Sequence, residues 1–257
     1  MFLNFTVQGA GQPLLLIHGL FGSLSNLNIL ARALAKYYQV YRIDLPNHGQ
    51  SPHSNTVNYV AQAIAVKDFI DQQGLKYISI VGHSMGGKVA MALAITYKDL
   101  VDKLVVMDIA PVKYNIRHHD TILAGLSATK KSRIRSRKEA EITLFQYIHD
   151  PNIRQFLLKS LAKQYDGSFN WRFNVDVFEA HYDDIIDWPL GSIFTNNTLF
   201  LKGANSDYIS AEYYKSIKSQ FPQAKVHVVA NTSHWLHTEK PDIVARIITR
   251  FLINLKH

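Results

Sequence analysis

Cysteine and long apolar runs are both missing from this 257-residue sequence. Without cysteine, the chain forms no disulfide bonds and has no thiolate chemistry, which fits a reducing cytoplasm. No uninterrupted apolar run approaches the roughly 18 residues that a membrane-spanning helix needs. The segment from Met1 to Gly11 lacks a basic region followed by an apolar stretch, so it does not resemble a secretion signal. We therefore expect a soluble, cytoplasmic protein that has no membrane partner.

Acidic residues are fewer than basic ones, 20 against 28, which gives a formal net charge of +8. A basic excess raises nucleic acid as a partner. Six of the basic residues lie in the run 130–138, however, and neither a recognition motif nor interleaved aromatic residues accompany them. Because such a run is more typical of a solvated helix face, we expect no nucleic-acid partner.

Short apolar segments alternate with longer amphipathic ones along most of the chain. Residues 14–18, 40–44, 77–82 and 103–108 are apolar at nearly every position, as parallel strands buried on both faces are. The segments 59–73 and 86–97 have helical spacing and predict connecting helices. After Pro189 the pattern returns, with strands expected at 198–202 and 225–230 and helices at 210–221 and 241–255. The alternation predicts an α/β sheet protein.

The stretch 112–189 interrupts this alternation. It has no convincing strand pattern and predicts several amphipathic helices, for example at 139–149 and 152–164. We therefore expect a core made of residues 1–111 and 190–257, and a helical cap of residues 112–189 inserted into it.

A G-x-S-x-G motif occupies residues 82–86, directly after the third clear strand. A tight turn from a strand into a helix strains its central residue and requires very small residues two positions to either side. Gly82 and Gly86 meet that requirement. Ser84 would lie at the amino end of the helix, where free amides favour developing negative charge. The motif predicts Ser84 as a nucleophile.

A serine hydroxyl needs a general base to attack at neutral pH. Of the 12 histidines, only His234 lies in the loop between a predicted strand and the final helix, from which a side chain can reach back over the sheet. The oxyanion formed on attack also needs donors that are already in place. The glycine-rich turn 18–22 supplies the backbone amide of Leu20, and the residue after the nucleophile supplies that of Met85.

Four segments, LLLIHGLFGS, RIDLPNHGQS, VGHSMGG and SHWLHTEKP, resemble in order and spacing the α/β-hydrolase superfamily. Within it, VMDIAPV, the following R-H-H-D, the stretches FLLKSL and WRFNV, and GANSDYIS resemble the bacterial YbfF-like esterases. The resemblance implies an eight-stranded, mostly parallel sheet flanked by helices, with 2–8 as an early strand and the cap inserted after the sixth strand. It also implies that Ser84 and His234 hydrolyse an ester or thioester without a cofactor or metal ion.

The acid that orients the histidine has two candidates. In the common superfamily pattern it lies three residues beyond a glycine after the next-to-last strand, but here Ser206 occupies that place and Asp207 follows one residue late. Asp108 ends the buried strand after the elbow helix, so its carboxylate would emerge at the same edge of the sheet as Ser84 and His234. We predict Asp108 as the acid, with Asp207 as the alternative.

These residues predict acyl transfer to water through an acyl-enzyme, with a small-molecule ester or an acyl-CoA thioester as substrate. The serine at the elbow disfavours dehalogenases and epoxide hydrolases, which carry a carboxylate there. Peptidase, C–C bond hydrolase and perhydrolase activities remain alternatives, as does a non-catalytic ligand-binding protein. Either a monomer or a homodimer is compatible with the sequence.

Aromatic residues mark a candidate substrate site. Trp235 is adjacent to the predicted base, and Phe169, Trp171 and Phe173 lie near the middle of the cap. We expect Trp235 to contact substrate, and the four side chains together are candidates for an apolar wall along the acyl chain. For the three cap aromatics, ordinary packing in the core of the cap is the alternative, and the sequence slightly favours it. The basic run 130–138 is a candidate contact for an anionic leaving group such as coenzyme A.

Overall fold

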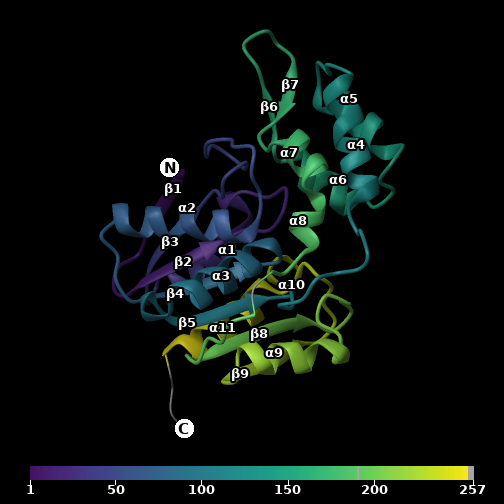
Figure 1. Cartoon of the computed structure of the whole chain (residues 1–257). Coiled ribbons are helices and arrows are strands. Elements are labelled where there is room, and N and C mark those ends of the chain that lie inside the picture. Colours follow the sequence, from purple (N-terminus) through teal and green to yellow (C-terminus); the bar gives the residue numbers. More distant parts are fainter. Residues whose placement is uncertain (190, 254–257) are drawn as a thin grey trace.

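A sheet of seven strands forms the centre of the computed structural model, which describes residues 1–189 and 191–253 (Figure 1). The strand order is β1-β3-β2-β4-β5-β8-β9, and all neighbours are parallel except β1, which pairs antiparallel with β3. The strands are β1 (Phe5–Gln8), β2 (Pro13–Ile17), β3 (Gln39–Ile43), β4 (Ile78–His83), β5 (Val101–Met107), β8 (Thr198–Gly203) and β9 (Ala224–Val229).

Helices cover both faces of the sheet, which is why its strands are apolar at successive positions. Along β2, Leu15 and Ile17 belong to one buried cluster, whereas Leu14 and Leu16 belong to the cluster on the other face. The first face is covered by α2 (Tyr59–Gln72), α3 (Met85–Thr96) and α9 (Tyr214–Gln220), and the second by α1 (Asn28–Leu34), α10 (Leu236–Glu239) and α11 (Pro241–Ile253). Short 3₁₀ helices occupy Leu24–Leu27, Lys98–Leu100 and Ala211–Tyr213.

The predicted strands and connecting helices are present, but the expected count of eight strands is wrong for the described residues. Only twelve residues precede β2, and they form a single short strand, β1. For the same reason the insertion follows the fifth strand, β5, and not the sixth. The helix expected at 210–221 begins with a 3₁₀ turn. The last two residues of the helix expected at 241–255 lie outside the described residues, and so does the predicted boundary at 190.

Residues 112–189, named the insert from here on, lie above the sheet in Figure 1. They form α4 (Asp120–Lys131), α5 (Arg137–Phe145), α6 (Pro151–Leu158), α7 (Val175–Ala180) and α8 (Tyr182–Ile186), together with a hairpin of β6 (Leu161–Lys163) and β7 (Phe169–Trp171). The expectation of helices alone is therefore wrong. The helix expected at 152–164 ends at Leu158, and a turn at Gly167, whose φ is +82°, closes the hairpin.

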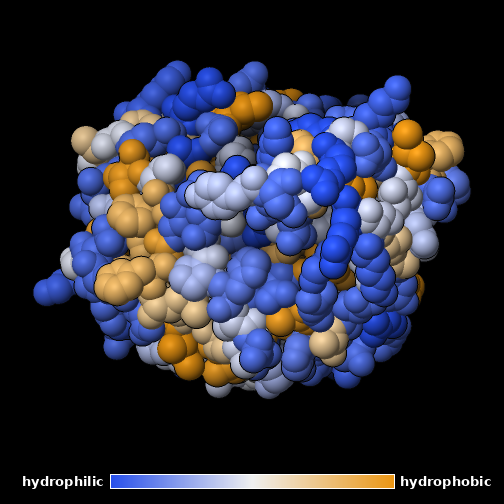
Figure 2. Space-filling view, turned by 90° about the horizontal axis from the view of Figure 1, so that it is seen from above, coloured by the Kyte–Doolittle hydropathy of each residue, from blue (hydrophilic) through white to orange (hydrophobic). Residues whose placement is uncertain are grey.

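The surface on the insert side is mostly hydrophilic, with separate apolar patches (Figure 2). A search of the described residues for a helix both long and apolar enough to cross a bilayer finds none.

The order of the strands places the site. From β2 the chain moves toward one edge of the sheet to form β3, and then crosses back to form β4 on the other side of β2. At such a switch the loops leaving two neighbouring parallel strands diverge and leave a crevice at their carboxyl ends. The loop after β2 and the turn after β4 therefore meet there.

Candidate active site

Ser84 lies in the turn between β4 and α3 in a strained backbone conformation, with φ 52° and ψ −123°. Its backbone N–H donates to the carbonyl of Met107 at 2.9 Å, which ties the turn to β5. A Cβ on Gly82 would lie 2.3 Å from the carbonyl oxygen of Gly86, and one on Gly86 would lie 2.3 Å from that of His18. Only glycine fits at these two positions, as the motif predicted.

The imidazole of His234 lies beside the carboxylate of Asp108, although 126 residues separate them. The distance from His234 Nδ1 to Asp108 Oδ2 is 2.8 Å, and the Asp108 side chain is completely buried at the end of β5. The other oxygen, Oδ1, accepts the backbone N–H of Gly203 at 2.8 Å. Asp207 is exposed, so of the two candidate acids the structure places Asp108 against His234.

Two contacts of this pair were not anticipated from the sequence. Ser206, the residue found where the superfamily pattern has an acid, donates its hydroxyl to Asp108 Oδ2. Tyr208 stacks on the ring of His234, with centroids 4.1 Å apart and an interplanar angle of 27°. The position of Ser206, three residues beyond Gly203, was the available signal, because it places a hydroxyl at the sheet edge where the acid is needed.

Neutral imidazoles surround His234. Burial, followed by repulsion from His237 and His234, lowers the pKa of His83 well below its ordinary value, and burial lowers the pKa of His237 and of His119 to about 3. His83 Nε2 donates to the carbonyl of His234 at 3.0 Å and fixes the loop. Because these neighbours are uncharged, the carboxylate of Asp108 is the charge in contact with an imidazolium formed at His234.

The loop after β2 passes directly against the nucleophile. A Cβ on Gly19 would lie 3.2 Å from the Cβ of Ser84, so glycine permits this close approach. His18 fixes the loop, because its Nδ1 donates to the carbonyl of Gly19 at 2.8 Å while its Nε2 accepts the N–H of Leu45. The backbone amide of Leu20 has no hydrogen-bond acceptor in the described part of the chain.

The second predicted donor to the oxyanion is the amide of Met85. Met85 is the first residue of α3, where an amide has no partner within its own helix. Met85 and Leu20 both line the same cavity as Ser84. Within the described residues, Ser84 and His234 are near each other but not hydrogen-bonded, which is common in enzymes without bound substrate.

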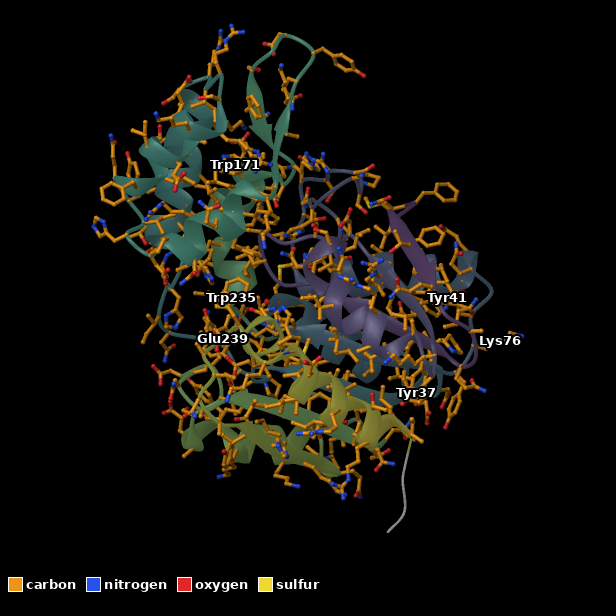
Figure 3. The ribbon with its side chains drawn as sticks, turned by 180° about the vertical axis from the view of Figure 1, so that it is seen from behind. Tyr37, Tyr41, Lys76, Trp171, Trp235 and Glu239 are labelled. Carbon is orange, nitrogen blue, oxygen red and sulfur yellow. The ribbon has the colours of Figure 1, made fainter. Side chains whose placement is uncertain are left out.

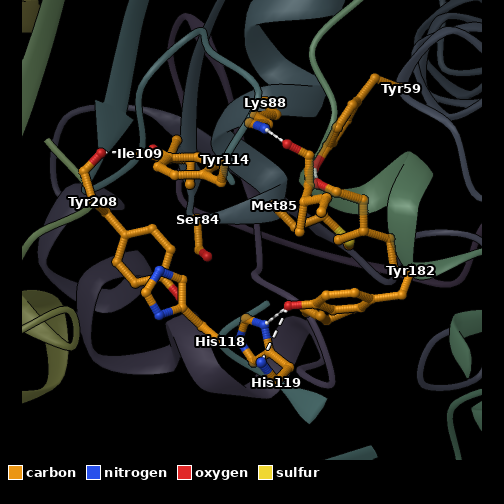
Figure 4. A pocket seen from close by; sticks show the side chains of 13 residues that line it. Tyr59, Ser84, Met85, Lys88, Ile109, Tyr114, His118, His119, Tyr182 and Tyr208 are labelled. Carbon is orange, nitrogen blue, oxygen red and sulfur yellow. Dashed lines mark hydrogen bonds between the residues drawn. The ribbon is translucent and has the colours of Figure 1, made fainter. Parts of the chain in front are cut away.

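Two cavities meet at Ser84. The small lobe, with a cavity volume of about 30 Å³, is lined by Ser84, the two predicted oxyanion residues and a group of buried polar and aromatic side chains that includes Lys88, Tyr114 and Tyr182 (Figure 4). The large lobe, about 170 Å³, is lined by Ser84, His234 and mostly apolar side chains, among them Phe156 and Trp235. The described residues contain no group of three or more His, Asp and Glu placed to hold a metal ion.

Trp235 lines the large lobe, whereas Phe169, Trp171 and Phe173 line neither lobe. Trp171 stacks on Phe173 with centroids 5.4 Å apart and packs inside the insert, whereas Trp235 lies where the insert meets the core (Figure 3). Phe169 also packs against the buried cluster. Of the two places expected for these three residues, packing in the core of the insert is the one that the structure shows.

Lys88 is a buried amine in the lining of the small lobe that was not predicted from the sequence. Its Nζ donates to the carbonyl oxygens of Ile186 at 3.1 Å and Asp187 at 2.8 Å, where the insert returns to the core. Burial lowers the pKa of Lys88 to about 7, and the nearby carboxylate of Asp187 offsets part of that effect. A lysine within an otherwise apolar helix was the signal, since lysine is rarely buried without partners.

Comparisons with known proteins agree with the fold described above. The family described as alpha/beta hydrolase fold matches residues 12–241. Esterase YbfF of Escherichia coli K12 is 42% identical over 257 residues, which cover 98% of this chain and 99% of that protein. The sn-1-specific diacylglycerol lipase ABHD11 of Mus musculus is 38% identical, over 92% of this chain and 79% of its own. A solved structure named Marine microorganism esterase has a TM-score of 0.94 at 39% identity and covers 97% of this chain and 99% of its own. The similarity extends over the core and the insert alike.

Proposed function

The chain belongs to the α/β-hydrolase fold family and is a carboxylic ester hydrolase, and on this premise we propose that it works through a Ser84–His234–Asp108 triad and an acyl-enzyme. The observation that carries the proposal is the 2.8 Å hydrogen bond from His234 Nδ1 to the buried carboxylate of Asp108, beside a serine held in a strained elbow. A carboxylate at Nδ1 leaves Nε2 unprotonated and free to act as a base.

In the first half-reaction, Nε2 of His234 takes the proton of the Ser84 hydroxyl while Oγ attacks the carbonyl carbon of the ester. The amides of Leu20 and Met85 donate to the oxyanion of the tetrahedral intermediate. The intermediate then breaks its bond to the alcohol oxygen, which receives the proton from His234. An acyl group remains bonded to Ser84, and the alcohol leaves.

In the second half-reaction, His234 takes a proton from a water molecule that attacks the acyl carbon. The bond to Ser84 Oγ breaks, the serine recovers its proton from His234, and the carboxylic acid leaves. Asp108 stays ionised in both halves and stabilises the imidazolium. No other group has to change its protonation state.

We further propose that residues 112–189 act as a cap domain over a core of 1–111 and 190–257. Support comes from the lining of the two lobes, because Tyr182 and Ile185 of the insert close the small lobe, and Ile153 and Phe156 line the large one. The insert therefore supplies much of the surface that a substrate would touch.

An acyl-CoA thioester is the alternative substrate class. Its support is the exposed basic run 130–138, although Lys130 already pairs with Asp176 at 2.5 Å and Arg135 donates to the carbonyl of Asp166. If the run binds an anionic leaving group, added salt raises KM for acetyl-CoA and leaves KM for a neutral acetate ester unchanged, because exposed charges are screened over about 10 Å at 0.1 M salt. Equal salt effects on the two substrates would rule this contact out.

The proposed function is tested by replacing the nucleophile. We expect Ser84→Ala to lower kcat for p-nitrophenyl acetate by at least ~10⁴ and to abolish labelling by a fluorophosphonate, with no loss of fold by circular dichroism. Ser219→Ala, at an exposed position of α9, is the matched control and should keep both activity and labelling. Activity retained in Ser84→Ala would refute an acyl-enzyme at this residue.

A further inference from the structure

We infer that the two lobes divide the substrate at its carbonyl carbon, so that the small lobe takes a short acyl group and the large lobe takes a bulky, apolar alcohol. This inference rests on the proposed function and specifies its substrate class: acetate or propionate esters of apolar alcohols. It follows from the position of the base, the sizes of the lobes and the way their walls are held.

The position of the base sets the direction of the substrate. The alcohol oxygen must lie within hydrogen-bond reach of His234 Nε2, because that atom returns the proton to it. His234 lines the large lobe and is absent from the lining of the small lobe. Ser84 and Leu20 line both lobes, so the reacting carbon lies at their junction. The alcohol therefore extends into the large lobe, which leaves the small lobe for the acyl group.

The sizes of the lobes set the substituents. A cavity needs roughly 10–15 Å³ on this measure to hold one water molecule. The small lobe, at about 30 Å³, therefore has room for about two water-sized groups, which corresponds to the methyl or ethyl of an acetyl or propionyl group. The large lobe, at about 170 Å³, is several times larger and accommodates a six-carbon chain or an aromatic ring.

Buried hydrogen bonds hold the walls of the small lobe. Tyr182 OH bonds to His119 Nδ1 at 2.7 Å (Figure 4). Tyr114 OH accepts the N–H of Ala110 at 2.8 Å. Tyr114 OH also donates to the carbonyl of Tyr208 at 2.6 Å. Moving one of these rings aside for a longer chain would leave a buried polar group without its partner, which costs about 1–3 kcal/mol. The lobe therefore resists expansion.

The side chains that line the large lobe alone are held differently, whereas His119 and Tyr208 line both lobes. Ile122, Ile153, Phe156 and Trp235 are half-buried, and their side chains make no hydrogen bond within the described residues. The ring of Trp235 contacts that of Phe156 at a centroid distance of 4.5 Å and also contacts the imidazoles of His83 and His234. Side chains without hydrogen bonds can change rotamer at little cost. This lobe is therefore both larger and more adaptable, and its lining favours an apolar alcohol.

A pair of isomeric esters tests the assignment. Hexyl acetate and ethyl hexanoate have the same molecular formula. The six-carbon group is the alcohol in the first ester and the acyl group, counted with its carbonyl carbon, in the second. We expect kcat/KM for hexyl acetate to exceed that for ethyl hexanoate by at least about tenfold, since one misplaced methylene in a tight pocket already has an effect of that size. Equal values, or a preference for ethyl hexanoate, would overturn the assignment.

A matched pair of substitutions locates the effect. Ile185→Ala enlarges the small lobe, and Ile153→Ala makes the same chemical change in the large lobe. We expect Ile185→Ala to shift the ratio of the two kcat/KM values toward ethyl hexanoate by about tenfold, and Ile153→Ala not to shift it in that direction. The ratio is independent of how much of each variant is folded. A shift toward ethyl hexanoate in Ile153→Ala alone would reverse the assignment of the lobes.

Fluorophosphonate labelling separates the two possible failures. If Ser84 is labelled but hexyl acetate is not the better substrate, the lobe assignment is wrong and the serine mechanism stands. If Ser84 is not labelled and neither ester is hydrolysed, the proposed function fails and the inference fails with it.

Discussion

Replacing Asp108 by asparagine should inactivate the enzyme by changing which nitrogen of His234 carries a proton. One carboxylate oxygen of Asp108 accepts the backbone N–H of Gly203, and the other accepts His234 and the hydroxyl of Ser206. The backbone N–H can only donate, so the amide oxygen of an asparagine must face Gly203. The amide NH₂ then faces Nδ1 of His234 and the hydroxyl oxygen of Ser206, and both atoms can accept a hydrogen bond from it.

The magnitude follows from this arrangement. An NH₂ at Nδ1 makes that nitrogen an acceptor and places the ring proton on Nε2, so the imidazole can no longer take the proton of Ser84. Loss of this orienting carboxylate elsewhere lowers kcat by on the order of 10⁴, which corresponds to about 5.4 kcal/mol of transition-state stabilisation. Because the asparagine satisfies all three partners, we expect the melting temperature of Asp108→Asn to change by only a few degrees.

The assay compares Asp108→Asn with Asp207→Asn, the same chemical change at the alternative acid. Asp207 is exposed, so we expect kcat for p-nitrophenyl acetate to stay within about twofold of the parent enzyme in that variant. Thermal unfolding of both proteins controls for loss of structure. The reasoning is refuted if Asp108→Asn keeps more than a tenth of the parent activity, or if Asp207→Asn loses more activity than Asp108→Asn does.

Three further predictions concern the surroundings of the triad. Burial lowers the pKa of Lys88 to about 7, so between about pH 7 and 10 the unfolded chain binds more protons than the folded one, and the free energy of unfolding rises with pH. Lys88→Met should remove a rise on the order of 3 kcal/mol between these two pH values, measured by urea unfolding. An unchanged rise in the variant would contradict this. A Cβ at Gly203 would lie 2.2 Å from the carbonyl oxygen of Ser233, so Gly203→Ala should displace the loop that carries His234 and lower kcat at least about tenfold. A kcat equal to that of the parent enzyme would show that the loop can relax. Trp235→Ala should raise KM for hexyl acetate about fivefold and leave KM for methyl acetate nearly unchanged. The melting temperature should change little, because Trp235 is only half-buried. Equal changes in KM for both esters would instead indicate a general structural role.

The main sheet could be predicted because its strands are buried on both faces and so consist of nearly unbroken apolar runs. Residues 14–18, 40–44 and 198–202 each lie within one residue of an observed strand. The hairpin of β6 and β7 could not be predicted in the same way. Its strands have three residues each, which is too few to show a periodicity, and they lie within an insert whose other segments have helical spacing. The turn residues Asp166, Gly167 and Ser168 were the signal for it. The resemblance to α/β hydrolases is confirmed, although it implied one strand too many.

The parts of the site that depend on local sequence could also be predicted, whereas those that depend on contacts between distant residues could not be derived from local motifs alone. The elbow around Ser84 is a local motif whose glycines are dictated by contacts within the turn, so the sequence is enough to predict it. The pairing of His234 with Asp108 spans 126 residues, and the choice between Asp108 and Asp207 depends on which side chain the end of β5 buries. The two lobes depend on how the insert packs over the core, and no spacing in the sequence encodes that packing.

The backbone conformation of Ser84 has a consequence for how such proteins evolve. With φ 52° and ψ −123°, this residue occupies a conformation that glycine tolerates and that costs other residues on the order of 1–3 kcal/mol. Glycine at this position should therefore make the protein harder to unfold while removing the nucleophile. A laboratory selection for heat resistance alone would favour the inactive chain, so the serine is retained only while hydrolysis itself is under selection.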